Sequence, residues 1–319
     1  MWTDAMPMLN ITAHEDHCHL HAAGGPLLPE LKAALDRDPG PVTVMVHGFR
    51  YQPGLTDHCP HQTLFATGPA TATIPAWPRH LGLRGQAGEG LGLSFGWFAR
   101  GTIWQAHRRA ETAGHALARL LADVKALDPQ RPVHAIGHSL GARVILSAIR
   151  AGQPGVIDRT VLLAGAEFAG TARHVLHSSA GRRTEVLNVA SRENDLFDFM
   201  LERLVPAEAP GDRMLGAART TGMAPNMVTL QLDDARSLSA LRAAGFPISP
   251  TQQRICHWSP YMRAGVFPLY RAYLSGTLPL ARLRGILPDA TTARWSRLLS
   301  RPFWATPDIN AAGALTKQS

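Results

Sequence analysis

Six short apolar segments recur along the chain, separated by stretches with a different pattern of polar and apolar positions. The segments are 42–48, 91–97, 132–139, 159–166, 185–191 and 227–233. They are rich in Leu and β-branched residues and show little alternation, which is typical of strands that are covered on both faces. The pattern therefore predicts a mostly parallel sheet.

Amphipathic helices are predicted in several of the intervals between these strands. A clear helical pattern begins near Thr102 and continues to Val124, and Thr102 with Gln105 has the spacing of a capping box. Further helices are predicted over 31–37, 140–151 and 196–204. Because strands alternate with helices, we expect an α/β fold with a doubly wound sheet and right-handed crossovers.

Two regions depart from this alternation. Residues 49–90 are rich in His, Pro, Gly and Thr and have no clear period, which predicts a long loop insertion able to act as a lid. Residues 278–319 have weak helical character and a polar end, and are expected to form a C-terminal extension. The length of 319 residues predicts one domain, 1–319, with its core at about 40–275.

Composition argues against several classes of function. The net charge is +8, but the Arg residues are scattered and no nucleic-acid motif accompanies them, so nucleic acid is not an expected partner. The three cysteines, Cys18, Cys59 and Cys256, do not form a disulfide framework. The sequence has neither a membrane-spanning apolar run nor a recognisable signal peptide, so a cytoplasmic location is expected.

Two segments match the motif Gly-x-Ser-x-Gly. They are GLSFG around Ser94 and GHSLG around Ser139. The motif places a nucleophilic serine in a strained turn between a strand and a helix. Ser139 has a predicted strand before it and a predicted helix after it. Ser94 is followed by Trp97 and Phe98 before any helix begins. We therefore predict that Ser139 is the nucleophile and that Ser94 lies within or beside a strand.

The segment GHSLGARV, with VMVHGF about ninety residues earlier, resembles the α/β-hydrolase superfamily. The resemblance covers roughly residues 40 to 275 and is nearest to bacterial serine hydrolases of poorly defined function. It implies an α/β-hydrolase fold, with the loop insertion directly after the strand that carries one oxyanion donor. It also implies that Phe49, which follows His47-Gly48, is this donor. The N–H of Leu140, at the start of a helix, is the second predicted donor. His47 is expected to be structural.

A serine nucleophile needs a histidine base, and this base needs a carboxylate that fixes its tautomer. In this fold they follow the serine in the order acid, then histidine. Asp195 lies just beyond the strand 185–191 and is the predicted acid, while Glu193 and Asp198 remain alternatives. His257 is the only histidine after Asp195 and is therefore the predicted base.

Aromatic residues near the predicted loops favour an apolar pocket, and Tyr51, Trp97 and Trp258 are expected to bind substrate. Histidines and cysteines are also concentrated in HEDHCHLH, 14–21, and DHCPH, 57–61. Their spacing matches no standard zinc motif, so neither a metal nor a cofactor is expected. A structural metal that joins the two stretches is an alternative that metal analysis would test.

Together these features predict a serine hydrolase with a Ser139–Asp195–His257 triad. It would cleave an ester or thioester of a small or medium acyl chain through an acyl-enzyme on Ser139. A small-molecule acyl ester is thus the expected partner, and the oligomeric state is not indicated. Two alternatives remain open, namely an acyltransferase with the same residues and a non-catalytic binding module on the same fold.

Overall fold

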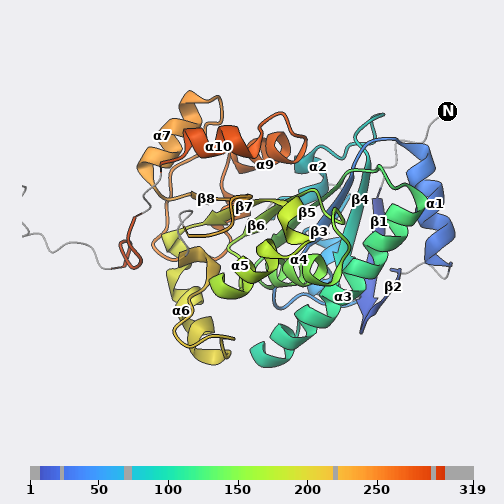
Figure 1. Cartoon of the computed structure of the whole chain (residues 1–319), viewed down its shortest axis with the longest axis horizontal. Helices are drawn as coiled ribbons and strands as arrows, with labels where there is room; N and C mark the ends of the chain where they lie inside the picture. Colours follow the sequence, from blue (N-terminus) through green and yellow to red (C-terminus); the bar gives the residue numbers. More distant parts are fainter. Residues whose placement is uncertain (1–7, 22–24, 68–73, 218–221, 289–291, 299–319) are drawn as a thin grey trace, which may run out of the picture.

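An eight-stranded sheet forms the centre of this computed structural model (Figure 1), which describes residues 8–21, 25–67, 74–217, 222–288 and 292–298. From one edge to the other its strands are β2 (His17–Leu20), β1 (Met8–His14), β4 (Leu91–Gly96), β3 (Val42–Val46), β5 (Val133–His138), β6 (Arg159–Leu163), β7 (Glu185–Ala190) and β8 (Met227–Gln231). Every neighbouring pair is parallel except β1 and β2. The predicted fold class, a doubly wound and mostly parallel α/β sheet of the α/β-hydrolase type, is confirmed.

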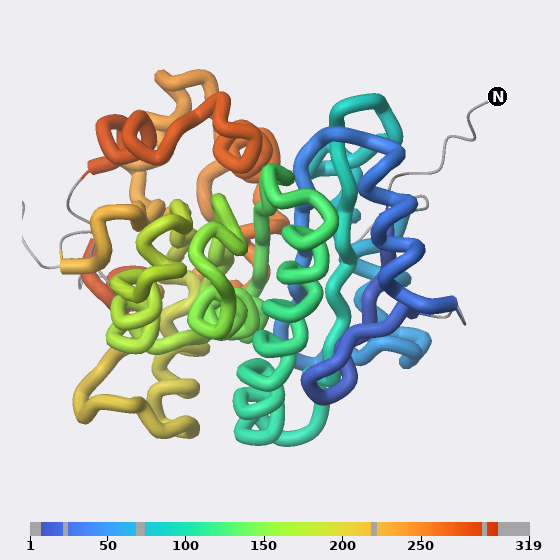
Figure 2. Tube along the Cα trace, turned by 45° about the vertical axis from the view of Figure 1, so that its right-hand side comes forward, coloured from blue at the N-terminus to red at the C-terminus, as the bar shows by residue number. Residues whose placement is uncertain are grey.

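Helices cover both faces of the sheet. One group is α1 (Leu27–Arg37), α3 (Ile103–Leu127), α4 (Leu140–Ala151), α5 (Ala169–His177) and α6 (Asp195–Leu204). The other is α2 (Trp77–Leu81), α7 (Ala235–Ala243), α8 (Ser259–Met262), α9 (Val266–Leu274) and α10 (Leu280–Ile286). Short 3-10 helices lie at Thr56–His58, Pro60–Gln62, Gly181–Arg183, Arg192–Asn194 and Leu215–Ala217. Figure 2 shows α3 and α4 side by side.

The core is divided into two apolar layers by the sheet. Strand residues alternate between them, so that Val44 packs with the first helix group whereas Met45 packs with the second. Both side chains are fully buried, which explains why apolar residues of this strand do not alternate with exposed polar ones.

Local signals define the two helices that matter most for the site. At the start of α3, Thr102 Oγ1 accepts from the Gln105 N–H and Gln105 Oε1 accepts from the Thr102 N–H, so the predicted capping box is present. Helix α4 begins at Leu140, directly after β5, and ends before Gly152, as predicted.

The N-terminal hairpin, β1 and β2, was not predicted from the sequence. Ile11 of β1 pairs with Leu20 of β2, and β1 also pairs with β4 and extends the sheet. Its signal is weak because three of the four residues of β2 are His or Cys, and only Leu20 there is buried. The six predicted apolar strands correspond to β3 to β8, and the hairpin adds two strands at one edge of the sheet that they form.

The two irregular regions contribute to the apolar layer on the side of the second helix group. In the stretch 49–90, Phe65 and Trp77 are fully buried, and the Trp77 ring lies 5.4 Å from Tyr261. In the C-terminal region, α10 contributes buried Leu280 and Leu283. The end of the predicted C-terminal extension, 299–319, lies outside the described residues. Among those described, no helix is both long and apolar enough to cross a membrane.

Candidate functional site

Ser139 occupies the turn between β5 and α4. Its backbone has φ 56° and ψ −123°, and a positive φ is uncommon for a residue with a side chain. Strain of this kind costs about 1–3 kcal/mol and persists only where neighbouring contacts impose it. The Ser139 N–H donates to the Leu163 carbonyl at 2.9 Å, and the Ser139 carbonyl accepts from the N–H groups of Ala142 and Ala166, each at 3.0 Å. Contacts with β6, its following loop and α4 thus hold the turn.

Three glycines allow the segments around Ser139 to approach closely. A Cβ at Gly141 would lie 2.5 Å from the Val46 carbonyl oxygen, and one at Gly137 would lie 2.8 Å from the Gly141 oxygen. A Cβ at Gly48 would lie 2.8 Å from the Cβ of Ser139. The glycines of the motif therefore serve the contact between α4 and the ends of β3 and β5, as a nucleophile turn requires.

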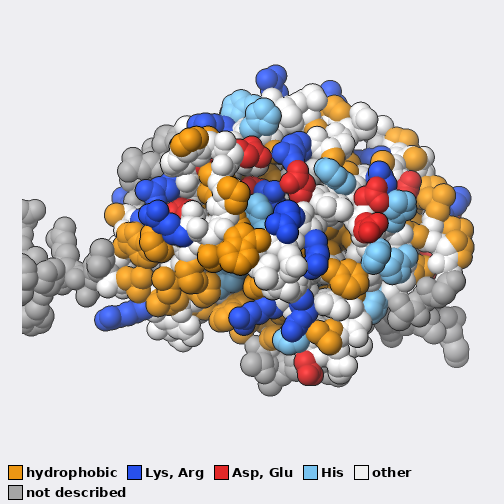
Figure 3. Space-filling model, turned by 90° about the horizontal axis from the view of Figure 1, so that it is seen from below, with side chains coloured by type: hydrophobic (Ala, Val, Ile, Leu, Met, Phe, Trp, Pro, Cys, Tyr) orange, Lys and Arg blue, Asp and Glu red, His pale blue; other side chains and the backbone are white. Residues whose placement is uncertain are grey.

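Ser139 opens onto a cavity of about 460 Å³, called here the Ser139 cavity. Its lining consists of Phe49, Arg50, Tyr51, His58, Ile103, His138, Ser139, Leu140, Ala164, Ala166, Phe197, Asp198, Met200, Leu201, Leu204, His257 and Trp258. Figure 3 views the molecule from below and shows hydrophobic side chains gathered on the side of α6, with Lys and Arg side chains around them. The cavity thus combines an apolar wall with a small number of polar groups.

Two backbone N–H groups flank the turn, those of Phe49 and Leu140, and both residues line the Ser139 cavity. Within the described part of the chain neither N–H donates to a protein acceptor, whereas the Arg50 N–H donates to the Ala99 carbonyl at 2.9 Å. Leu140 is also the first residue of α4, where the helix dipole favours negative charge. Both N–H groups are available to an anionic oxygen.

His257 lines the same cavity as Ser139. Its Nδ1 lies 2.6 Å from Oδ1 of Asn194, and its ring stacks on Phe197 with a centroid distance of 4.8 Å. An amide oxygen can only accept, so Nδ1 carries the hydrogen and Nε2 is the nitrogen able to take a proton. The His257 carbonyl accepts from Nε2 of His138 at 2.9 Å. The ring is thus held in one orientation, with the hydrogen on Nδ1 while the amide oxygen of Asn194 faces it.

Burial keeps both histidines next to Ser139 neutral. It lowers the pKa of His138 to about 4. It also lowers the pKa of His257 well below the ordinary value, and the neighbouring His138 adds to this effect. Both rings are therefore neutral near pH 7, the state in which an imidazole can act as a base.

The structure does not bring the predicted acid, Asp195, to His257. One carboxylate oxygen of Asp195 lies 3.1 Å from the Arg192 guanidinium and the other accepts from the Trp295 N–H at 2.6 Å. Helix α6 begins at Asp195, and successive residues of a helix point about 100° apart. The residue that contacts His257 is the preceding one, Asn194. Sequence reasoning missed Asn194 because it searched for a carboxylate.

The two alternative acids have different environments. Asp198 lines the cavity and its Oδ1 accepts from Nδ2 of Asn194 at 2.8 Å, so it lies one hydrogen bond behind the residue that contacts His257. Glu193 is buried and forms an ion pair with Arg263. Its backbone carbonyl accepts from the Cys256 N–H at 2.9 Å, so Glu193 anchors the loop that carries His257.

Of the three predicted substrate-binding residues, Tyr51 and Trp258 line the Ser139 cavity and Trp97 does not. Trp97 is 1% exposed and stacks on His47 at 5.5 Å. Its backbone N–H donates to Nε2 of His47 and its indole N–H donates to the His47 carbonyl, each at 3.0 Å. Trp97 thus holds the ends of β3 and β4 together, and His47 is structural, as predicted.

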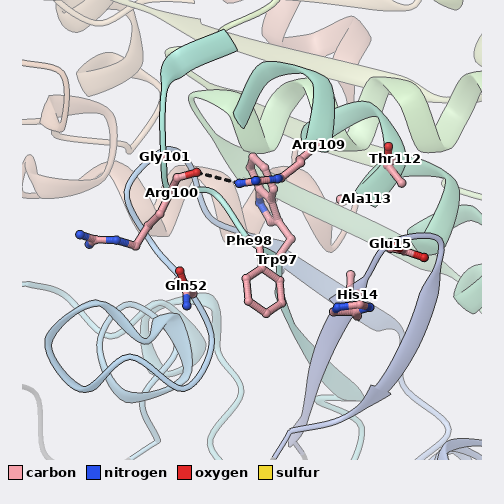
Figure 4. A pocket seen from close by; sticks show the side chains of 11 residues that line it. His14, Glu15, Gln52, Trp97, Phe98, Arg100, Gly101, Arg109, Thr112 and Ala113 are labelled. Carbon is pink, nitrogen blue, oxygen red and sulfur yellow. Dashed lines mark hydrogen bonds between the residues drawn. The ribbon is translucent and has the colours of Figure 1, made fainter. Parts of the chain in front are cut away.

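Trp97 instead borders a second cavity, of about 550 Å³, between the N-terminal hairpin and the start of α3 (Figure 4). Its rim is polar, and Arg109 donates to the Arg100 carbonyl at 2.9 Å. This second cavity shares no lining residue with the Ser139 cavity.

Ser94 lies inside β4 and is fully buried, in agreement with its predicted place in a strand. Its Oγ lies 2.6 Å from Nδ1 of His61. The two histidine-rich stretches do meet, since the His61 ring lies 4.3 Å from that of His21, and Nε2 of His21 lies 3.8 Å from Sγ of Cys59. No group of three His, Cys, Asp or Glu side chains in the described ranges has an arrangement that could hold a metal ion.

Comparison with known proteins yields distant similarities. A family model described as "Protein of unknown function (DUF726)" matches residues 101–208. No curated protein matches the chain. A solved metagenomic carboxyl esterase is 14% identical, with 78% of this chain and 76% of that chain covered and a TM-score of 0.32.

Two bacterial and archaeal structures are similarly distant. A protein described as a predicted CIB-like hydrolase from Thermoplasma acidophilum is 11% identical, with 60% of this chain and 75% of that chain covered and a TM-score of 0.29. The product of gene lin2722 from Listeria innocua is 12% identical, with 48% and 70% covered and a TM-score of 0.29. At such low identity a likeness concerns the fold and not the substrate.

The buried ion pair between Glu193 and Arg263 yields a prediction about stability. Glu193→Gln is expected to lower the free energy of unfolding by about 3–5 kcal/mol, because it leaves a buried guanidinium without its counter-charge. Glu185→Gln is the matched control, because Glu185 pairs with Arg159 at 3.0 Å but is 39% exposed. There the loss should stay below about 1 kcal/mol. Urea unfolding of both variants measures the difference, and equal losses would contradict the anchoring role of Glu193.

Proposed function

We propose that this protein is a serine hydrolase that cleaves a carboxylic ester or thioester through an acyl-enzyme on Ser139. The observation that carries the proposal is the positive-φ backbone of Ser139 at a strand-to-helix turn, open to a cavity that His257 also lines. A strained residue of this kind is characteristic of functional sites. The strand, the turn and the helix together meet the requirements of a nucleophile turn.

The proposed reaction begins when Nε2 of His257 takes the hydroxyl proton of Ser139 as Oγ attacks the carbonyl carbon. The N–H groups of Phe49 and Leu140 donate to the resulting oxyanion. Collapse of the tetrahedral intermediate breaks the bond to the leaving alcohol or thiol, which receives its proton from His257. His257 then takes a proton from the water that attacks the acyl-enzyme. It returns this proton to Oγ of Ser139 as the bond between Oγ and the acyl carbon breaks and the carboxylic acid leaves.

The lining of the cavity supports an apolar acyl group in the substrate. Its volume of about 460 Å³ is in the range of small-molecule sites. Met200, Leu204 and Trp258 line it and are all more than 40% exposed. Trp104, which is 46% exposed, donates its indole N–H to the Leu204 carbonyl. Large apolar side chains exposed together in this way are characteristic of a binding surface.

A fluorophosphonate probe tests the nucleophile. We expect stoichiometric labelling of the wild-type protein on the tryptic peptide that contains Ser139, because Ser139 and the neutral His257 line the same cavity. Ser139→Ala should abolish labelling. Ser94→Ala is the matched control and should be labelled like wild type, since Ser94 is fully buried in β4. Labelling that survives Ser139→Ala and disappears in Ser94→Ala would refute the assignment.

A series of p-nitrophenyl esters tests the apolar acyl group. Burial of each methylene contributes about 0.8 kcal/mol, so kcat/KM should rise about fourfold per methylene until the cavity is filled. Met200→Ser should flatten this dependence, because Met200 lines the cavity. Leu28→Ser is the control, because Leu28 is 50% exposed on α1 and does not line it. A flat chain-length profile in wild type would contradict the apolar acyl site.

A further inference from the structure

We propose that Asn194 and Asp198 act as one positioning unit for the base His257, in place of a carboxylate that contacts the imidazole directly. This inference rests on the proposed function, since it assigns the group that prepares His257 for proton transfer. Neither residue is catalytic in the sense of touching substrate. Their effect passes through His257, by way of its orientation, its tautomer and the stability of its charged form.

The unit is a continuous chain of two hydrogen bonds. Nδ1 of His257 lies 2.6 Å from Oδ1 of Asn194, and Nδ2 of Asn194 donates to Oδ1 of Asp198 at 2.8 Å. Asn194 is 3% exposed and Asp198 is 4% exposed, so water does not compete well for either bond. The two residues are four positions apart at the start of α6, which is the spacing that brings side chains together on one face of a helix.

An asparagine alone does not determine which histidine nitrogen is the base, because its amide can turn. If the NH₂ group faced His257, Nδ1 would have to accept, and the hydrogen would sit on Nε2. Nε2 would then be unable to take the proton of Ser139. An ionised Asp198 can only accept, so it requires the NH₂ group of Asn194 and leaves the amide oxygen for His257. Asp198 thereby selects the productive tautomer.

The other nearby carboxylates have partners elsewhere, and Glu193 pairs with Arg263. Both oxygens of Asp195 have partners, Arg192 and the Trp295 N–H. Asp198 is thus the carboxylate that the hydrogen bonds of the described residues connect to the imidazole. When His257 becomes positively charged during the reaction, the negative charge of Asp198 also favours that state across the amide.

The charge of Asp198 depends on pH in the neutral range. Burial raises its pKa to about 7, Asp195 and Glu202 raise it as well, and Arg294 and Arg192 oppose the rise. Above this value the carboxylate is ionised and enforces the orientation of Asn194. Below it the protonated carboxyl no longer requires the amide NH₂ group. Wild-type kcat/KM should therefore rise with pH through about 7.

A swap of the two side chains gives the sharpest test. The readout is kcat/KM for a p-nitrophenyl ester between about pH 5 and pH 9, with fluorophosphonate labelling of Ser139 in parallel. Asp198→Ala should lower kcat/KM about 100-fold or more, because the tautomer of His257 is no longer selected. Asp198→Asn keeps an acceptor and loses the charge, so it should be less impaired and should lose the rise near neutral pH.

The double variant N194D/D198N places the carboxylate on His257 and the amide behind it. It should recover kcat/KM to within about tenfold of wild type, with the acidic limb of the pH profile displaced. A purely structural role of Asp198 predicts no such rescue. Asp195→Asn is the matched control at the next position. It should keep the rise of kcat/KM with pH but displace it to lower pH, because Asp195 no longer raises the pKa of Asp198. Circular dichroism confirms that each variant is folded.

Three outcomes would overturn the inference. The first is an Asp198→Ala variant that keeps the kcat/KM of wild type. The second is an Asp198→Asn variant with an unchanged pH profile. The third is a loss of kcat/KM in Asp195→Asn that does not occur in N194D/D198N. Failure of the proposed function has a different signature, because wild-type Ser139 would then not react with the fluorophosphonate at all.

Discussion

The site depends on the close approach of three backbone segments, the end of β3, the turn at Ser139 and the first turn of α4. Gly141 lies against the Val46 carbonyl and Gly48 against the Cβ of Ser139, so any side chain at either glycine would force the segments apart. At this contact Ser139 takes its positive φ, and Phe49 and Leu140 line the same cavity. The sheet and its two helix layers act as the rigid frame that maintains this approach.

The remaining polar groups reach the turn from the other half of the chain. Glu193 pairs with Arg263 and binds the backbone at Cys256, so it fixes the loop that carries His257. Asn194 then contacts His257, and Asp198 contacts Asn194. These groups are buried or nearly so. Because an unpaired polar group is costly away from water, burial favours the one arrangement in which all of these hydrogen bonds form. Neutral His257 and an apolar cavity are two consequences of the same exclusion of water.

The sequence predicts the central strands and the main helices well, for a physical reason. Strands that are buried on both faces require mostly apolar side chains with little alternation, so β3 to β8 are visible as short apolar segments. The strand-to-helix context separates Ser139 from Ser94 for a similar reason, because β5 and α4 each have a clear pattern. The β1–β2 hairpin escapes prediction because its edge strand needs few apolar residues and carries mostly histidines.

Side-chain direction is what the sequence does not reveal. Asp195 and Asn194 are adjacent, and which of them faces His257 depends on the residue at which α6 begins, since one step of a helix turns a side chain by about 100°. Trp97 follows a strand and is aromatic, yet its burial on His47 results from contacts between β3 and β4 that no periodicity encodes. The sequence predicts which residue types lie near the site. The direction in which each side chain points depends on the folded structure.

The covalent intermediate itself is the most direct test of this account. Mixing the protein with a p-nitrophenyl ester, quenching in acid within the first turnover and measuring the intact mass should reveal one acyl group per chain. Peptide mapping should locate this group on Ser139, and Asp198→Ala should accumulate it more slowly than wild type. Turnover of the ester without any adduct on Ser139, or with the acyl group on another residue, would contradict the account.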